Sequence, residues 1–281
     1  MNNSHSLLAA GQRHSVGRRS DGAVVAVGSH AVGECRTGEW RDVVAVAAGN
    51  VHVAKNTGRS HTLGLRSNGT VLAAGWNAYG QCDVDAWEDI IAVAAGWRFS
   101  VGVSRSGVLR AVGRGSEGQL DVEQWREVVS ASCGDWHTVA LRADGTVRAA
   151  GNNTKGQCEV RSWTGMCAVA AGYLHTLGLM SSGAVLANGN PAFWSGCEWW
   201  TDIVAVAAGS YHSVGLTAHG TVVAAGRSDC GQCDVGDWRN VVAVAAGAEH
   251  TLGVRADGSV LSAGANDYGQ RNVDGWSLID A

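Results

Sequence analysis

Six histidines stand at one position of a repeated segment, and their type and spacing raise the question of a metal site. Each follows a short turn and begins an apolar run, as in residues 61–65. The six are His14, His61, His137, His175, His212 and His250, and Phe99 takes the place of histidine in the remaining repeat. Metal ions in proteins are bound by a few side chains that converge on one point. Six equally spaced rings cannot do so, and we expect each to form a structural hydrogen bond with neighbouring backbone.

Cysteines follow the same repeat. Five of the eight share one position, namely Cys35, Cys82, Cys158, Cys197 and Cys233. Adjacent sheets pack about 10 Å apart, and a disulfide requires Cα atoms within about 7 Å, so we predict reduced thiols. Cys230 and Cys233 also form a C-x-x-C pair, which is a redox or half-zinc signature. The second of them is the repeat cysteine and no partner pair exists, so we predict neither a metal nor a cofactor.

The elements that position these residues are units of about 38 residues, each opened by a tryptophan. The openers are Trp40, Trp87, Trp125, Trp163, Trp200, Trp238 and Trp276, and we expect them to pack between blades. Each unit is typical of four strands: a small-residue strand, a strand that begins at the histidine, a third strand after an Asn-Gly or Asp-Gly hairpin, and a short fourth strand after a Gly-x-Asn-x-x-Gly-Gln-Cys loop.

The unit that starts at Trp276 stops at Ala281, and residues 8–39 supply the part that it lacks. The two ends of the chain therefore complete one unit, which indicates a ring. We predict an all-β fold with a single domain over residues 1–281. It is a seven-bladed β-propeller of four-stranded antiparallel blades, closed by pairing of the N- and C-termini in one blade.

This repeat resembles the regulator-of-chromosome-condensation repeat over essentially the whole chain. Its short period is similar to that of bacterial members, and its size resembles the seven-bladed β-lactamase inhibitory proteins. The resemblance implies several possible roles, and in those inhibitors aromatic residues of one propeller face grip an enzyme.

Composition limits the classes of partner and the location. The net charge is −4 and charged residues are 16%, which argues against nucleic acid because phosphate binding needs a basic face. No apolar run is long enough to span a bilayer, so we expect no membrane partner. The N-terminal residues lack the regions of a secretory signal, and we predict a cytoplasmic protein.

Residues that depart from the repeat gather on one predicted face. Strand direction alternates, so the turn before the histidine and the loop after the third strand emerge on the same side. The predicted recognition residues there are Trp76, Tyr79, Trp97, Arg98, Asp135, Trp136, Tyr173, Phe193, Trp194, Tyr211, Glu249 and Tyr268. Such aromatic and charged groups are typical of binding hot spots. Our leading interpretation is a binding protein that recognises a protein or a small apolar ligand; a mere aromatic cap over the core is the structural alternative.

The unit that starts at Trp40 is longer than the others, and its extra residues lie at 50–60. They could form a lid over the channel mouth that carries His52 and Lys55, or a tolerated surface insertion. The second hypothesis is therefore an enzyme of specialised metabolism with its site beneath this loop. Its candidate groups are His52, Asp135, Glu249, Arg13 and Arg98. A bacterial enzyme inhibitor is the third hypothesis.

Overall fold

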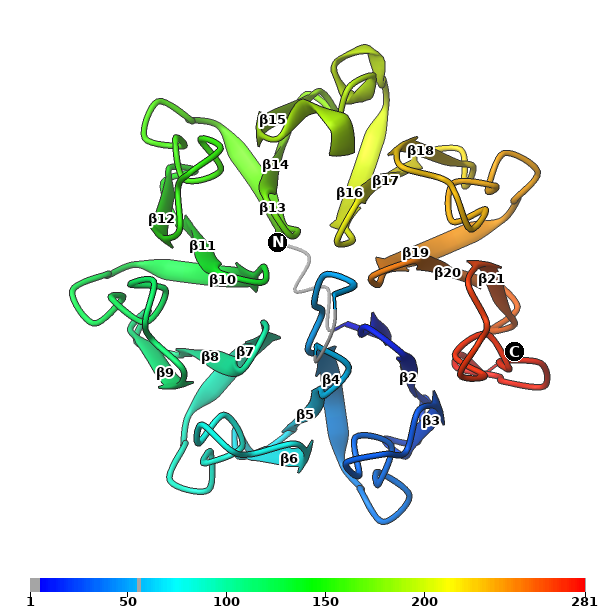
Figure 1. Ribbon diagram of the computed structural model, residues 1–281, viewed down its shortest axis with the longest axis horizontal. Coiled ribbons are helices and arrows are strands. Elements are labelled where there is room, and N and C mark those ends of the chain that lie inside the picture. The colour runs from blue at the N-terminus through cyan, green and yellow to red at the C-terminus, as the bar shows by residue number, and fades with distance from the viewer. Residues whose placement is uncertain (1–5, 55–56, 281) are drawn as a thin grey trace.

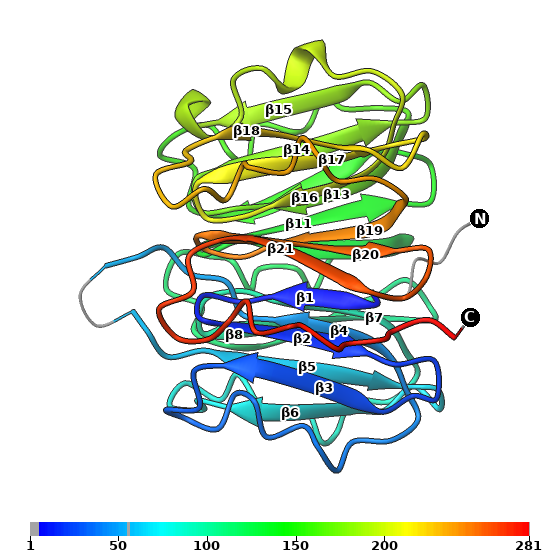
Figure 2. The same cartoon turned by 90° about the vertical axis from the view of Figure 1, so that its right-hand side faces the viewer.

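Seven antiparallel sheets are arranged around a central axis (Figure 1). The computed structural model describes residues 6–54 and 57–280. In every sheet the strands follow chain order, and the first strand lies nearest the axis. The predicted all-β fold with seven blades is therefore present. Figure 2 shows that the described parts of the segment between the second blade's first two strands project from one side of the disc.

Each blade begins with an inner strand rich in alanine and valine, which fits the crowded axis. These inner strands are β1 (Leu8–Ala10), β4 (Val43–Ala48), β7 (Ile90–Ala95), β10 (Val128–Cys133), β13 (Met166–Ala171), β16 (Ile203–Ala208) and β19 (Val241–Ala246). The middle strands are β2 (His14–Arg18), β5 (His61–Arg66), β8 (Phe99–Ser104), β11 (His137–Arg142), β14 (His175–Met180), β17 (His212–Thr217) and β20 (His250–Arg255). The outer strands are β3 (Val24–Gly28), β6 (Val71–Gly75), β9 (Leu109–Gly113), β12 (Val147–Gly151), β15 (Val185–Gly189), β18 (Val222–Gly226) and β21 (Val260–Gly264).

The blades have three strands, so the prediction of four is wrong. The segment expected to form the fourth strand is instead wound into successive turns. In the second blade, Asn77 Oδ1 accepts a hydrogen bond from the Cys82 amide at 2.7 Å, and Gln81 Oε1 accepts one from the Tyr79 amide at 3.0 Å. Gly80 lies between them with a φ of 79°. Side chains that satisfy the backbone locally remove the need for a sheet partner. In the fifth blade this segment contains two short 3₁₀ helices, η1 (Pro191–Phe193) and η2 (Cys197–Trp199).

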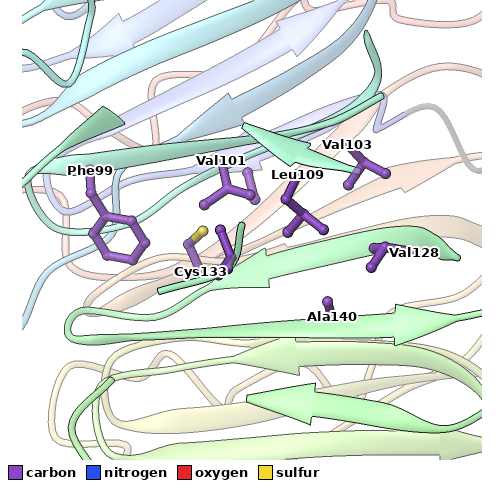
Figure 3. Packing of buried hydrophobic residues seen from close by; sticks show 9 residues of the cluster. Phe99, Val101, Val103, Leu109, Val128, Cys133 and Ala140 are labelled. Carbon is purple, nitrogen blue, oxygen red and sulfur yellow. The ribbon is translucent and has the colours of Figure 1, made fainter. Parts of the chain in front are cut away.

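The repeated tryptophans pack against glycines of the middle strands. Trp87 is 4% exposed and lies against Gly102 of β8, whose missing side chain leaves room for the indole. The same tryptophan also packs with Leu63 of the preceding blade, as expected for a residue between blades. Figure 3 shows the apolar core between the third and fourth blades, where Phe99 lies near Cys133.

The first and last sheets contact each other. Ser15 of β2 donates a hydrogen bond to the Gln270 carbonyl at 2.7 Å, and its hydroxyl lies 3.0 Å from His250 Nε2. Trp276 and Leu278 lie against Gly17 of β2, as Trp87 lies against Gly102. Pairing of the two termini within one blade remains a prediction, which these contacts favour. Within residues 6–54 and 57–280, no helix has the length and apolar character that a membrane crossing requires.

Candidate functional site

The six repeated histidines join each blade to a neighbouring one. Each ring Nε2 lies 2.8–3.2 Å from a serine or threonine hydroxyl of another blade. The pairs are His14–Thr62, His61–Ser100, His137–Thr176, His175–Ser213, His212–Thr251 and His250–Ser15. The partner is thus a side chain and not the neighbouring backbone that the sequence led us to expect.

The hydroxyl of each pair fixes the protonation of the ring. Thr176 Oγ1, for example, donates its single hydrogen to the Gln157 carbonyl at 2.7 Å. It can then only accept from His137, so the proton of the neutral imidazole is on Nε2. Burial lowers the pKa of His137 to about 4 and that of His61 to about 3. These rings are neutral structural donors at neutral pH.

The eight cysteines, all within the described residues, are free thiols. Several of the repeated thiols donate to a backbone carbonyl, as Cys82 Sγ does to Trp76 at 3.5 Å. Burial raises the pKa of Cys82 to about 12, so this thiol is protonated and unreactive. Among the described residues, no three histidine, cysteine or acidic side chains converge as metal ligands.

The loop between β4 and β5 carries His52 to the middle of the ring of inner turns. The backbone amide of His52 donates to Asp135 Oδ2 at 2.6 Å, and its Nδ1 lies 2.8 Å from the same oxygen. Asp135 belongs to the turn between β10 and β11 and is fully buried. Burial raises the pKa of this carboxyl, and the hydrogen bond and charge of His52 oppose the shift.

Three aromatic rings surround the imidazole of His52. Tyr173 stacks on it with ring centroids 4.5 Å apart and planes inclined by 17°. Trp97 and Trp136 meet it at a steep angle, with centroids at 5.4 and 5.7 Å. We call Trp97, Trp136 and Tyr173, together with Asp135 beside them, the aromatic cage.

Further hydrogen bonds hold the rest of this loop against the inner turns. The Val53 amide donates to the Tyr211 hydroxyl at 2.8 Å, and Ser210 Oγ donates to Asn50 Oδ1 at 3.2 Å. On the other side, Gln12 Nε2 donates to Thr57 Oγ1 at 3.1 Å. The loop therefore covers the aromatic cage, whereas Lys55 lies outside the described residues.

A second cluster combines arginines with aromatic rings beside the cage. The guanidinium of Arg98 lies over the rings of Trp97, Trp76 and Tyr79, at 4.0, 4.9 and 5.1 Å from their centroids. Arg59 lies over Trp76 at 5.6 Å and Arg114 over Trp97 at 5.3 Å. We call Arg59, Trp76, Tyr79, Arg98 and Arg114 the arginine–aromatic patch.

The electrostatics of the patch are dominated by its cations. Arg98 Nη1 donates to the Tyr79 hydroxyl at 3.1 Å. Partial burial, above all, lowers the pKa of Arg98, and the nearby charges of Arg114 and Arg59 act in the same direction. The Tyr79 side of the patch is open to solvent, since Tyr79 is 45% exposed.

The structure brings most of the predicted aromatic residues into one network. Phe193 lies 6.4 Å from Tyr173 and 5.4 Å from Tyr211, and Tyr173 lies 5.9 Å from Trp136. Trp136 in turn stacks with Trp97 at 5.9 Å. The aromatic side chains thus form a continuous arc on the face that carries the inner turns.

Other predicted residues lie outside this arc. Trp194 packs against the core of its blade and donates through Nε1 to the Gly189 carbonyl at 3.4 Å. Tyr268 lies under the guanidinium of Arg13 at 4.3 Å, and Glu249 is partly exposed. Of the candidates for catalysis, His52 and Asp135 contact each other, whereas Arg13, Arg98 and Glu249 have other surroundings.

The sequence placed Arg59 in an inner turn at the channel mouth, but the predicted recognition residues include neither Arg59 nor Arg114. Arg59 stands in the turn before a repeat histidine, close to the position that Arg98 and Arg13 hold in their own repeats. Arg114 directly follows the third strand, which is the position of Trp76. Comparison of repeat positions for arginine as well as for aromatic residues is the signal that could have found both.

Seven such sheets with a loop-built face define a β-propeller of a recognisable family. The model of the regulator of chromosome condensation (RCC1) repeat matches residues 56–81, 90–119, 128–157, 203–232 and 241–270. The chain belongs to this family, as its sequence predicted. Among curated proteins, none matches the chain in sequence.

Solved structures share the fold at low sequence identity. The ectodomain of the Physcomitrella patens receptor kinase CR4 is 16% identical with a TM-score of 0.74, over 92% of this chain and 73% of that one. The CRINKLY WD40 ectodomain of the Arabidopsis thaliana receptor kinase ACR4 is 21% identical with a TM-score of 0.69, over 92% and 95%. Prp20p from Saccharomyces cerevisiae is 18% identical with a TM-score of 0.66, over 92% and 82%. At these identities the likeness concerns the fold.

Proposed function

We propose that this chain is a protein-recognition module that binds an acidic surface of its partner through the arginine–aromatic patch. The observation that carries the proposal is the position of the Arg98 guanidinium over three aromatic rings. Arginine stacked on aromatic rings is held in place, and its remaining N–H groups stay available for a carboxylate. Tryptophan, tyrosine and arginine are also the residues that contribute most to protein interfaces.

Charge distribution supports an acidic partner. The chain as a whole carries −4, yet Arg59, Arg98 and Arg114 gather around two tryptophans. Arg114 has one acidic neighbour, Glu117 at 3.4 Å, and that pair is partly exposed, so it contributes little to stability. A local positive surface on a negatively charged chain orients an incoming acidic partner.

The fold relatives are consistent with protein recognition. Prp20p has binding properties to Gsp1p and histones. Transfer of that general role rests on analogy of fold, so the patch itself must be tested.

Affinity capture with charge-reversed variants tests the proposal. We expect a partner that wild-type protein retains from the source cytosol to be lost with Arg98→Glu. The matched control is Arg105→Glu, since Arg105 is exposed in the hairpin between β8 and β9, far from the patch. Recovery of the same partners by both variants, with equal thermal stability, contradicts the proposal.

The enzyme alternative keeps one specific observation in its favour, the contact between His52 Nδ1 and Asp135. A carboxylate that orients an imidazole is a common arrangement for general-base chemistry. If the chain is an enzyme, His52→Gln abolishes turnover of its substrate and Arg98→Glu leaves the chemical step intact. An inhibitor role is the special case in which the captured partner is an enzyme whose activity falls on binding.

We further propose a cytoplasmic location. The eight free thiols support it, because such thiols persist in reducing compartments. Labelling of the thiols in intact cells, followed by a count of the oxidised fraction, tests this; a largely oxidised population contradicts it.

A further inference from the structure

We propose that the aromatic cage is a binding site for an organic cation of the alkylammonium class, and that the His52 side chain occupies it in the free protein. The two sites share one ring, that of Trp97, over which Arg98 lies. The proposal nevertheless stands apart from the protein-recognition role, because Asp135, Trp136 and Tyr173 belong to the cage alone. The two can therefore fail separately.

The chemistry of the cage is that of a cation site. Three rings lie with their centroids 4.5–5.7 Å from the imidazole of His52, and one carboxylate oxygen lies 2.8 Å from its Nδ1. Aromatic faces attract quaternary and alkylated ammonium groups, and the attraction grows when water is excluded. A purely apolar ligand gains nothing from a buried carboxylate, whose desolvation is costly.

The carboxylate of Asp135 is only partly satisfied. Its Oδ2 accepts both hydrogen bonds from His52, whereas Oδ1 is buried without a hydrogen-bond partner. A carboxylate oxygen left this way is uncommon in folded proteins and calls for an explanation. A cation beside Asp135 supplies the missing positive charge.

The cage is built without the loop that fills it. Trp97 belongs to the turn between β7 and β8, Asp135 and Trp136 to that between β10 and β11, and Tyr173 to that between β13 and β14. His52, in contrast, lies in the long connection between β4 and β5. It enters the site as a side chain from outside and retains 13% exposure. His52 therefore stands in the place of a ligand.

Competition with His52 sets the apparent affinity. A ligand that binds only to the empty cage has a reduced apparent affinity. That affinity equals its affinity for the empty cage multiplied by the fraction of molecules in which His52 has left the cage. Removal of the imidazole abolishes this competition and leaves the rings and the carboxylate in place. His52→Ala is thus expected to bind the cation more tightly than the wild type does.

Isothermal titration calorimetry with choline tests the site, with its neutral isostere 3,3-dimethylbutan-1-ol as the matched ligand. We expect the wild type to bind choline in preference to the isostere and His52→Ala to bind choline about tenfold more tightly. In the His52→Ala background, Trp136→Ala or Asp135→Asn should weaken binding by about tenfold or more. Trp199→Ala is the control, because Trp199 is 81% exposed and outside the cage; it should change nothing.

Two outcomes overturn the proposal. One is equal binding of choline and the isostere, since the cage then selects shape and not charge. The other is binding of choline by His52→Ala and not by the wild type, since the site then exists only after the His52 imidazole has been removed. Titration with N-acetyl-trimethyllysine amide separates the sources of the cation: tighter binding than choline assigns the site to a modified side chain, and weaker binding assigns it to a free small cation.

Discussion

The imidazole of His52 reaches a carboxylate 83 positions away in the chain, with its Nδ1 2.8 Å from Asp135 Oδ2. This contact joins an insertion of the second blade to a regular turn of the fourth. It ties down a loop that otherwise has to be held by single hydrogen bonds such as that from Val53 to Tyr211. The pair therefore decides whether the cage is covered.

Loss of the Asp135 carboxylate should release this loop. Asp135→Ala removes the acceptor for two hydrogen bonds, and bonds to a charged group contribute about 1.5–3 kcal/mol each. We expect trypsin to cleave after Arg59, an exposed residue of the loop, at least about tenfold faster, which corresponds to about 1.4 kcal/mol. Asp85→Ala is the control, since Asp85 is exposed in an outer loop. Equal cleavage of both variants would show that His52 and Asp135 do not hold the loop.

Acid should unfold the protein well above pH 4. In the unfolded chain the histidines titrate near pH 6.5, whereas burial lowers the folded pKa of His14, His137 and His212 to about 4 and that of His61, His175 and His250 to about 3. Below pH 6.5 the unfolded state therefore binds more protons, and stability falls as pH falls. Six such groups together weaken folding by up to about 8 kcal/mol per pH unit.

The free energy of unfolding of an ordinary domain is about 5–15 kcal/mol. A fall of this size per pH unit therefore removes it within one or two pH units. We expect an unfolding midpoint near pH 5 by circular dichroism, with full stability above pH 7. A melting temperature that stays constant from pH 7.5 to pH 5 would contradict neutral burial of the six rings.

His137→Phe should reverse its effect on stability with pH. Phe99 shows that the repeat position accepts phenylalanine, and Thr176 keeps its bond to the Gln157 carbonyl. At pH 8 the variant loses one hydrogen bond, about 1 kcal/mol. At pH 5 each neutral buried histidine lowers the free energy of unfolding by about 2 kcal/mol, because that histidine binds a proton when the chain unfolds. The variant has one such histidine fewer and is therefore more stable than the wild type at this pH. Urea unfolding at pH 8 measures the deficit, and acid unfolding followed by circular dichroism measures the gain, because the variant should unfold at a lower pH than the wild type. Exposed His219→Phe serves as control. A variant that unfolds at the same pH as the wild type, or at a higher one, would rule out the assignment.

Repetition explains how much of the fold the sequence could predict. Seven tryptophans at a nearly constant spacing indicate the number of blades, and a glycine turn in each unit, Asp-Gly or Asn-Gly in four of the seven, indicates the strand order. The prediction of a fourth strand was wrong because the side chains of Asn77 and Gln81 accept hydrogen bonds from the backbone of their own loop. Strand propensity does not indicate whether a side chain will do so. The same repetition marked out Trp97, Trp136 and Tyr173, which stand at one turn of successive blades.

Contacts between segments that are distant in the chain could not be predicted from the sequence. His52 and Asp135 were both candidate residues, yet no spacing indicated that they meet, because the path of an inserted loop depends on what it packs against. The hydroxyl partners of the histidines were missed for a related reason. Thr62 follows His61 directly, but the strand pleat sends it to another blade, where it contacts His14.

The fit between tryptophan and glycine can be tested by adding one methyl group. In Gly102→Ala the new Cβ would lie 2.7 Å from Trp87 Cζ3, too close for a buried ring to accept without movement. We expect a loss of about 1–3 kcal/mol in the free energy of unfolding, measured in urea. Gly236→Ala is the matched control, since no atom lies within 4 Å of its added Cβ, and it should be neutral or slightly stabilising. The fourth blade already carries Ala140 at this position, and its Trp125 is less buried than Trp87. Ala140→Gly should therefore cost less than Gly102→Ala; the opposite order would mean that the indole does not require the glycine.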